Sequence, residues 1–241
     1  MAYDFDGAGD YITPFTKGAA ATDLQNFTYS FSLIRDAGGS NKNIFWSGFT
    51  WSDNFHSFIQ YDNGLSKLAL VTNWSTAEAR WSVPNTASDT SWHNHVIGYS
   101  YSATTNDPTW YIDGVSQTVS EHVTPSGTSN HTTDDGNISI GAGHDGSYEY
   151  WDGKIAEFAI WNRVLTAAEA TILGKGFSPL FIPNGLVFYA PLVRGAKDLK
   201  SGNSGTIVNA VVFPHPRIIY PYGDPTGIKL PTPKEIKKYA R

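Results

Sequence analysis

The chain has 241 residues and a net charge of −5, and only 16% of its residues are charged, against about 25% in an average soluble domain. This acidic balance argues against a nucleic-acid-binding protein, which needs a basic face, and no apolar run reaches the roughly 20 residues of a membrane span. Cysteine is absent, so no disulfide framework exists. We therefore expect neither nucleic acid nor membrane insertion among its interactions.

Short apolar and aromatic runs alternate with turn residues through the first two thirds of the sequence. The predicted strands are Tyr3–Asp6, Tyr11–Thr13, Phe27–Ile34, Lys42–Gly48, His56–Tyr61, Lys67–Asn73, Glu78–Ser82, His93–Ser102, Thr109–Ile112, Ser116–Ser120, Asn137–Gly141 and Lys154–Trp161. Asp113-Gly114 is a strong hairpin signal. Many short strands without interleaved helices predict an all-β, antiparallel sandwich or barrel.

Residues 92–101 predict a central strand, because both of its faces are partly apolar. His93, His95, Ile97, Tyr99 and Tyr101 fall on one face, and the residues between them fall on the other. The His93-x-His95 pair has the spacing for zinc on one strand face, but no third ligand is visible. A hydrogen-bonded structural pair is the better interpretation.

The stretch "DGKIAEFAIWNRVLTAAEATIL", residues 152–173, predicts one strand followed by one short helix. The strand is expected to open at an Asp152-Gly153 turn. Thr166 and Glu169 form a capping box, in which each side chain satisfies a backbone amide at the start of the helix. Gly174 is placed where the helix should stop.

Several of these segments resemble the concanavalin A-like (LamG-like) jelly-roll domains. "YDFDGAGDYI" resembles their opening, "TWYIDGVSQ" resembles a central hairpin, and residues 152–173 resemble the last strand with its closing helix. The resemblance spans residues 3–173 and implies an antiparallel two-sheet jelly-roll β-sandwich. One departure is the extra residue between Trp92 and His95, which predicts a bulge.

The C-terminal third resembles LamG-like proteins of tailed bacteriophages, through "GFSPLFIPNGLVFYAPLVRGAKDL" and "HPRIIYP". Strands are expected at Leu186–Pro191 and Thr206–Phe213. We divide the chain into a sandwich (1–176), strands that complete or annex it (177–213) and an extended Pro- and Lys-rich anchor (214–241). This resemblance implies a virion structural protein, such as a capsid decoration or a tail or fibre component.

Aromatic and polar residues between 46 and 81 suggest a glycan site, because sugars stack on Trp while amides and carboxylates take their hydroxyls. Trp51 and Trp74 lie beside turn residues and are expected to be exposed. The candidate glycan-binding residues are Trp51, Asp53, His56, Asn73, Trp74 and Arg80. An alternative function is therefore a carbohydrate-binding module or part of a polysaccharide depolymerase.

No catalytic constellation is evident, so we expect a non-enzyme. Glycoside hydrolysis needs two facing carboxyl groups, and the nearest candidates, Glu149, Asp152 and Glu157, share no strand register. Glu157 is expected to pair with Arg163 or Lys154. No cofactor is required, but calcium is a candidate ion, since loop carboxylates and amides are its preferred ligands. The candidate calcium ligands are Asp134, Asp135, Asn137 and Asp145, and a calcium-dependent adhesin is a further alternative.

The extension from Pro214 is expected to anchor the domain to other virion proteins or to a second copy. The predicted assembly contacts are Ile218, Ile219, Tyr220, Tyr222, Lys237 and Lys238. The opening residues are strand-like, so we expect no leader. The expected location is the virion surface, after assembly in the host cytoplasm, with cell-surface glycans as candidate partners.

Overall fold

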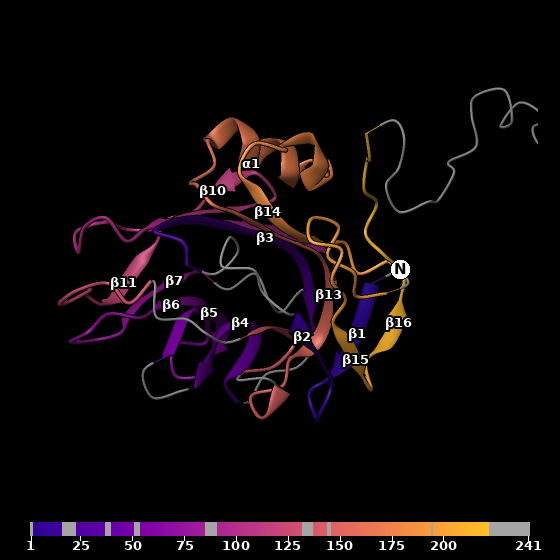
Figure 1. Cartoon of the computed structure of the whole chain (residues 1–241), viewed down its shortest axis with the longest axis horizontal. Helices are drawn as coiled ribbons and strands as arrows, with labels where there is room; N and C mark the ends of the chain where they lie inside the picture. The colour runs from indigo at the N-terminus through magenta and orange to yellow at the C-terminus, as the bar shows by residue number, and fades with distance from the viewer. Residues whose placement is uncertain are drawn as a thin grey trace, which may run out of the picture.

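Two antiparallel sheets pack face to face, and a short helix lies on the outer side of one of them (Figure 1). The computed structural model describes residues 2–15, 23–36, 40–50, 54–84, 91–131, 137–143, 146–193 and 195–221. The elements are β1 (Ala2–Asp6), β2 (Tyr11–Phe15), β3 (Asn26–Arg35), β4 (Lys42–Thr50), β5 (Asn54–Asp62), β6 (Lys67–Thr72), β7 (Ala79–Val83), β8 (His93–Ser100), β9 (Thr109–Ile112), β10 (Val115–Ser116), β11 (Ser120–Val123), β12 (Asn137–Ile140), β13 (Asp152–Trp161), α1 (Ala167–Gly174), the 3-10 turn η3 (Pro179–Phe181), β14 (Leu186–Ala190), β15 (Thr206–Val208) and β16 (Val211–Phe213).

The two sheets confirm the predicted all-β antiparallel sandwich. Sheet A has the order β10-β9-β8-β3-β13-β1-β16, with β14 also beside β13, and sheet B has the order β11-β7-β6-β5-β4-β12-β2-β15. The late strands belong to these sheets, because β14 pairs with β13, β15 with β2 and β16 with β1. Within the described residues, no helix is long and apolar enough to cross a membrane.

Strand β8 shows how the sequence builds three layers. Ile97 and Tyr99 point into the core between the sheets, whereas Val96 points outward into a second cluster under the helix. That second cluster includes Trp161 and Leu173. The pairing of β8 with β3 runs without a shift from His93 to Ser100, so the bulge expected near His95 is absent from this described ladder.

Strand β13 begins at Asp152, so the predicted turn at Asp152-Gly153 is wrong. Gly153 pairs with both Phe5 and Arg35 inside sheet A. Its φ is +138°, and a Cβ atom there would lie 2.1 Å from the carbonyl oxygen of Ile34. Only glycine lets the neighbouring backbone approach so closely, so the Asp-Gly pair serves the strand.

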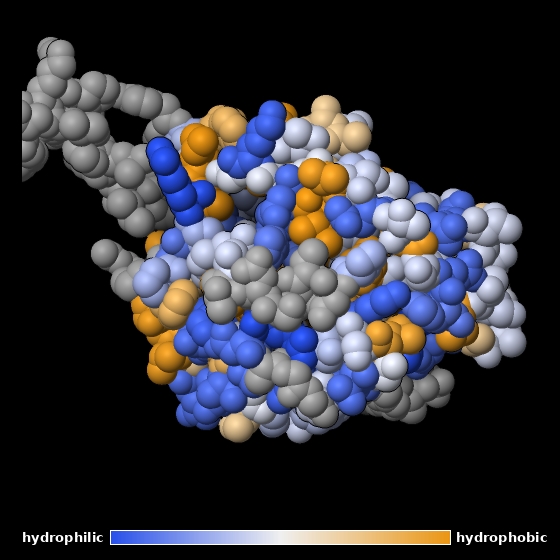
Figure 2. Space-filling model, turned by 180° about the vertical axis from the view of Figure 1, so that it is seen from behind, coloured by the Kyte–Doolittle hydropathy of each residue, from blue (hydrophilic) through white to orange (hydrophobic). Residues whose placement is uncertain are grey.

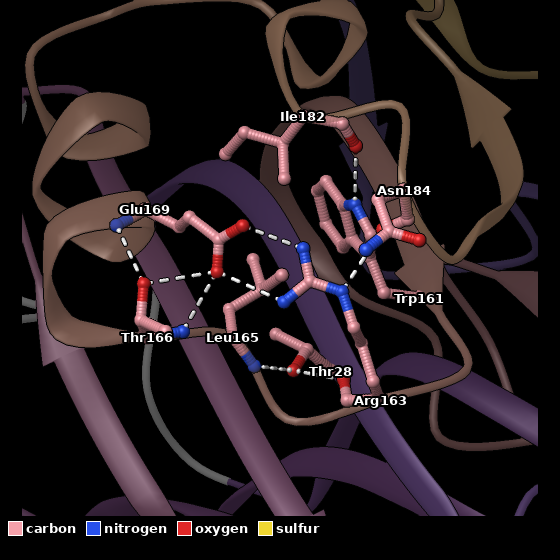
Figure 3. A network of polar contacts seen from close by, with 8 residues as sticks. All are labelled: Thr28, Trp161, Arg163, Leu165, Thr166, Glu169, Ile182 and Asn184. Atoms are coloured by element: carbon pink, nitrogen blue, oxygen red, sulfur yellow. Dashed lines mark hydrogen bonds and ion pairs between the residues drawn. The ribbon is translucent and has the colours of Figure 1, made fainter.

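The predicted capping box is present at the start of α1 (Figure 3). The Glu169 backbone N–H donates to Thr166 Oγ1 at 3.3 Å, and the Thr166 N–H donates to Glu169 Oε2 at 2.9 Å. Arg163 holds the same carboxylate with two N–H groups, and its Nε–H reaches the Asn184 carbonyl. The helix start is therefore tied to the end of β13 and to the segment before β14.

The surface opposite the view of Figure 1 is mainly polar, with its apolar side chains gathered in separate small patches (Figure 2). Among the described residues, the exposed large hydrophobic side chains include Val115, Val211 and Val212. Scattered apolar residues of this kind are normal on a folded surface. A function is therefore better sought in hollows that bring polar groups together.

Candidate functional site

Three of the predicted glycan-binding side chains lie in the interior. Trp74 is 5% exposed, so its predicted exposure is wrong; its ring packs on Tyr101, and its indole N–H donates to Thr72 Oγ1 at 3.2 Å. His56 is fully buried, and its Nε2–H donates to the Leu24 carbonyl at 2.9 Å. Asn73 is 5% exposed. These side chains can be buried because their polar atoms form hydrogen bonds within the chain.

The remaining candidates do not form one site with them. Arg80 is half-buried and binds Asp62 at 2.8 Å. Trp51 and Asp53 lie outside the described residues. The described chain therefore offers no cluster of exposed aromatic and polar side chains at the predicted place.

The calcium candidates are mostly beyond what the structure describes. Asp134, Asp135 and Asp145 lie outside the described residues, whereas Asn137 begins β12 and pairs with Gly48. Among the residues that are described, no group of three or more His, Cys, Asp or Glu side chains could hold a metal ion. Calcium binding stays a prediction.

The three acidic residues considered for catalysis lie in different surroundings. Asp152 belongs to an acidic hollow of about 400 Å³ with Asp4, Asp6, Asp10 and Asp36. Lys154 binds two of these carboxylates, those of Asp4 and Asp36. Burial raises the pKa of Asp4, Asp10 and Asp152.

Glu157 is 2% exposed, and its predicted pairing with Arg163 or Lys154 is wrong. Its carboxylate accepts from Tyr189 at 2.5 Å and Tyr220 at 2.8 Å, and it lies 3.0 Å from His215 Nε2. A shift in the β13 ladder, with a φ of +57° at Glu157, turns this side chain onto the outer face of sheet A. On that face, β14 brings Tyr189, and the C-terminal segment brings Tyr220 and His215.

The predicted assembly residues that are described contact the chain's own domain. The Ile219 N–H donates to the Gly176 carbonyl and the Ser178 N–H donates to the Ile219 carbonyl, at 2.8 and 2.9 Å. Tyr220 reaches Glu157, and Ile218 lines a pocket on sheet A. Tyr222, Lys237 and Lys238 lie outside the described residues. An assembly role for this segment stays a prediction.

A rim pocket of about 450 Å³ lies where β1 ends, β4 begins and the chain enters β13; its lining is Gly7, Ser40, Asn41, Lys42, Glu149 and Tyr150. Lys42 Nζ donates to the Gly7 carbonyl at 3.2 Å, which fixes the turn after β1 against β4. Tyr150 stacks on Tyr11, with ring centroids 6.2 Å apart. The rim pocket thus combines a carboxylate, an amide, an ammonium, a hydroxyl and a supported aromatic ring.

Glu149 supplies the carboxylate of the rim pocket. Its φ of +52° is unusual for a residue with a Cβ, and its backbone carbonyl accepts from the Asn43 N–H at 2.7 Å. The Asn43 side-chain amide donates to Glu149 Oε2 at 2.6 Å. Burial raises the pKa of Glu149, and hydrogen bonds from Asn43 and Asn41 oppose that rise. The side chain is thus a pre-positioned hydrogen-bond acceptor.

The sequence alone did not point to this pocket, because its residues come from three distant turns. The opening "FDGAGD" carried one signal: the Asp10 carboxylate accepts from the Asp6 N–H at 2.9 Å, and the Asp6 carboxylate accepts from the Ala8 N–H at 2.8 Å. These bonds shape the turn that places Gly7 at the pocket. The sequence had offered Glu149 only as a candidate catalytic carboxylate, and nothing around it indicated that it would meet Asn41 and Lys42.

Residues 6–171 match the concanavalin A-like lectin/glucanases superfamily. The chain belongs to this superfamily. The match includes strands β2 to β13 of both sheets and ends within α1, before β14, β15 and β16. No curated protein matches the sequence significantly.

Solved structures share the fold of this concanavalin A-like domain at low identity. A candidate carbohydrate binding protein from Bacteroides ovatus has a TM-score of 0.63 and 18% identity over 87% of this chain, which spans only 58% of that protein. A heptameric SAP-like pentraxin from Limulus polyphemus has a TM-score of 0.55 and 14% identity over 72% of this chain and 81% of its own. The CBM40 of the Ruminococcus gnavus IT-sialidase, bound to α2,3-sialyllactose, has a TM-score of 0.53 and 10% identity over 72% of this chain and 98% of its own. At these identities the likeness concerns the jelly-roll fold.

Proposed function

We propose that this concanavalin A-like domain binds carbohydrate and that the rim pocket is its ligand site. The observation that carries the proposal is the convergence of Glu149, Asn41 and Lys42 beside the supported ring of Tyr150. Sugar ligands need this combination, an aromatic face with a few fixed polar groups in a hollow. Membership in a lectin and glucanase superfamily supports the same class of ligand.

Binding without cleavage is the simpler chemistry for the rim pocket. Among its described lining residues, Glu149 is the one carboxylate, and glycoside hydrolysis generally needs a second. The fold is compatible with a non-enzyme, and we propose that this chain is one. Release of reducing ends from any glycan that binds would contradict this part of the proposal.

A glycan array probed with the full chain tests the function, and the bound glycan can then be titrated in solution. Glu149→Gln should weaken binding roughly tenfold to a hundredfold, because a hydrogen bond to a half-buried charge is lost. Glu121→Gln on β11, where the side chain is exposed, is the matched control and should leave binding unchanged. If wild-type chain binds no glycan, or if both variants bind equally, the rim pocket is not a sugar site.

The virion role predicted from the C-terminal resemblance remains a separate proposal. In it, the domain is displayed on a virion surface and anchored through its C-terminal extension, and the rim pocket contacts glycans. The comparisons offer no support for a bacteriophage origin, so the carbohydrate-binding proposal does not depend on it. Co-purification of the chain with particles, or its absence from them, tests this role.

A further inference from the structure

A second hollow, here called the outer pocket, lies on the outer face of sheet A beside the end of α1. Its volume is about 290 Å³. Its lining includes Ser32 on β3 and Asn94 on β8, Trp92 just before β8, Lys175 after α1 and Arg217 in the C-terminal segment. Sheet A separates it from the core between the sheets, so it is distinct from the rim pocket, with which it shares no lining residue.

The outer pocket contains a buried polar atom that the described part of the chain does not satisfy. Ser32, which lines the pocket, is 4% exposed. The Asn94 amide donates to Ser30 Oγ and to the Phe31 carbonyl, both at 3.4 Å, while its own buried Oδ1 has no partner among the described residues. Buried polar groups normally have partners. A ligand with hydroxyl groups could supply them.

The charges at the mouth of the pocket favour an anion. No described acidic side chain forms an ion pair with Lys175 or Arg217, both of which are exposed. The carboxylate of Asp113 is already engaged, by His93 at 2.6 Å and by the Asn94 N–H at 2.8 Å. The carbonyl end of α1 offsets part of the positive charge of Lys175. Arg217 keeps its full charge and can hold a carboxylate with two N–H groups.

Trp92 supplies an aromatic wall. Its side chain is half-buried, and its ring lies 6.4 Å from the ring of Phe213 on β16, which limits its freedom. A supported indole of this kind offers a flat apolar surface to the C–H face of a sugar ring.

The C-terminal segment closes the outer pocket, and it is firmly bound. Backbone hydrogen bonds join Ile219, two residues after Arg217, to Gly176 and Ser178. The hydroxyl of Tyr220 and the ring of His215 reach the buried Glu157. The pocket is thus part of the folded chain and not a gap beside a loose end.

We infer that the outer pocket binds an acidic saccharide, with Arg217 and Lys175 at its carboxylate, Trp92 against its ring, and Ser32 and Asn94 at its hydroxyls. The inference rests on the proposed carbohydrate-binding function and adds a second site with its own ligand class.

The test uses the full chain and an array of uronate- and sialate-containing oligosaccharides, each beside its neutral counterpart, a methyl ester or the desialylated sugar. The best acidic ligand is then titrated in solution. We expect it to bind at least tenfold more tightly than its neutral counterpart. Arg217→Gln should remove that preference, and Trp92→Ala should weaken both members of the pair. Lys200→Gln, an exposed lysine in another turn, is the charge-matched control and should change neither.

The outcomes separate this inference from the proposed function. If glycans bind but acidic and neutral partners bind equally, or if Arg217→Gln keeps the preference, the outer pocket is not an acidic-saccharide site, while the rim pocket can still be one. If Glu149→Gln abolishes binding of the acidic ligand and Arg217→Gln does not, that ligand belongs to the rim pocket and the inference is wrong. Because Arg217 is exposed, its variant tests the site even if Trp92→Ala fails to fold.

Discussion

His95 is an ionisable side chain that the fold keeps neutral. It is fully buried, its ring stacks on Phe31 at 5.4 Å, and its Nδ1 accepts the indole N–H of Trp110 at 3.2 Å. Burial lowers the pKa of His95 to about 3, whereas an unfolded histidine has a pKa near 6.5. Between these values the unfolded chain binds a proton that the folded chain excludes. Stability from this residue is therefore present above pH 6.5 and lost as the pH falls toward 3.

Urea unfolding at pH 7.0, 5.5 and 4.5 checks this prediction. The free energy of unfolding should fall by about 1–3 kcal/mol over that range through His95 alone, since each pKa unit is worth about 1.4 kcal/mol. His95→Phe should be less stable than wild type at pH 7.0, but its free energy of unfolding should fall less than that of wild type on acidification. The buried Asp10 and the half-buried Asp4 and Asp152 act in the opposite direction, because their raised pKa values favour the folded chain as the pH falls. The comparison of the two proteins removes their contribution; equal pH dependence in both would contradict the prediction.

At the scale of single elements, the carboxylate of Glu169 joins α1 to the sandwich. It accepts from Arg163 Nη1 and Nη2 and from the Thr166 N–H. Hydrogen bonds from Arg163 lower the pKa of Glu169 to about 2, against partial opposition from burial. Glu169→Gln should lower the free energy of unfolding at pH 7 by about 1–2 kcal/mol, the usual range for a lost cap and a charged hydrogen bond.

We also expect the stability that the Glu169 carboxylate contributes to be lost in acid. Its folded pKa lies below its unfolded value, so its contribution is complete above about pH 4.5 and disappears as the pH falls to 2. Chemical unfolding at pH 7 and pH 3 should show wild type and Glu169→Gln converging at the lower pH. Glu121→Gln is again the control, because its side chain is exposed on β11. A gap between wild type and Glu169→Gln that is equally wide at both pH values would show that packing, not the ionised carboxylate, holds the helix.

The elements differ in how far local sequence determines them. The capping box of α1 could be predicted, because Thr166 and Glu169 are three residues apart and satisfy each other's backbone groups. The Asp113-Gly114 hairpin could also be predicted, and Ile112 pairs with Val115 as expected. The role of Gly153 inside a strand could not be predicted, because the contact that requires glycine comes from Ile34, more than a hundred residues away. A local Asp-Gly signal does not distinguish a turn from a close approach between strands.

The site residues show the same limit more strongly. Trp74 follows a strand among polar residues, but it is buried in the core, where its ring packs on Tyr101 just after β8. Glu149 and Lys42 meet in the rim pocket through turns that no spacing rule connects. The local sequence therefore suggests residue types that suit a sugar site, but which side chains meet depends on which turns the two sheets bring together.

On the scale of the whole molecule, the outer face of sheet A is completed by the C-terminal segment. Glu157 is buried beneath that segment and accepts a hydrogen bond from Tyr220 at 2.8 Å. Removing the hydroxyl in Tyr220→Phe leaves the buried carboxylate with fewer donors, which costs about 1–3 kcal/mol when no water replaces them. We expect the variant to lose stability and to be cleaved faster by protease within residues 214–221.

Tyr111→Phe is the matched control for this experiment, because Tyr111 packs against the cluster under α1 but its hydroxyl makes no hydrogen bond to another described residue. Limited proteolysis followed by mass measurement locates the first cuts, and urea unfolding gives the difference in stability. If Tyr220→Phe is as stable and as resistant as Tyr111→Phe, its bond to Glu157 does not hold the segment. If the segment is released in Tyr220→Phe, Arg217 leaves the outer pocket with it, and the preference for an acidic saccharide should weaken in the same variant although every pocket-lining side chain is unchanged.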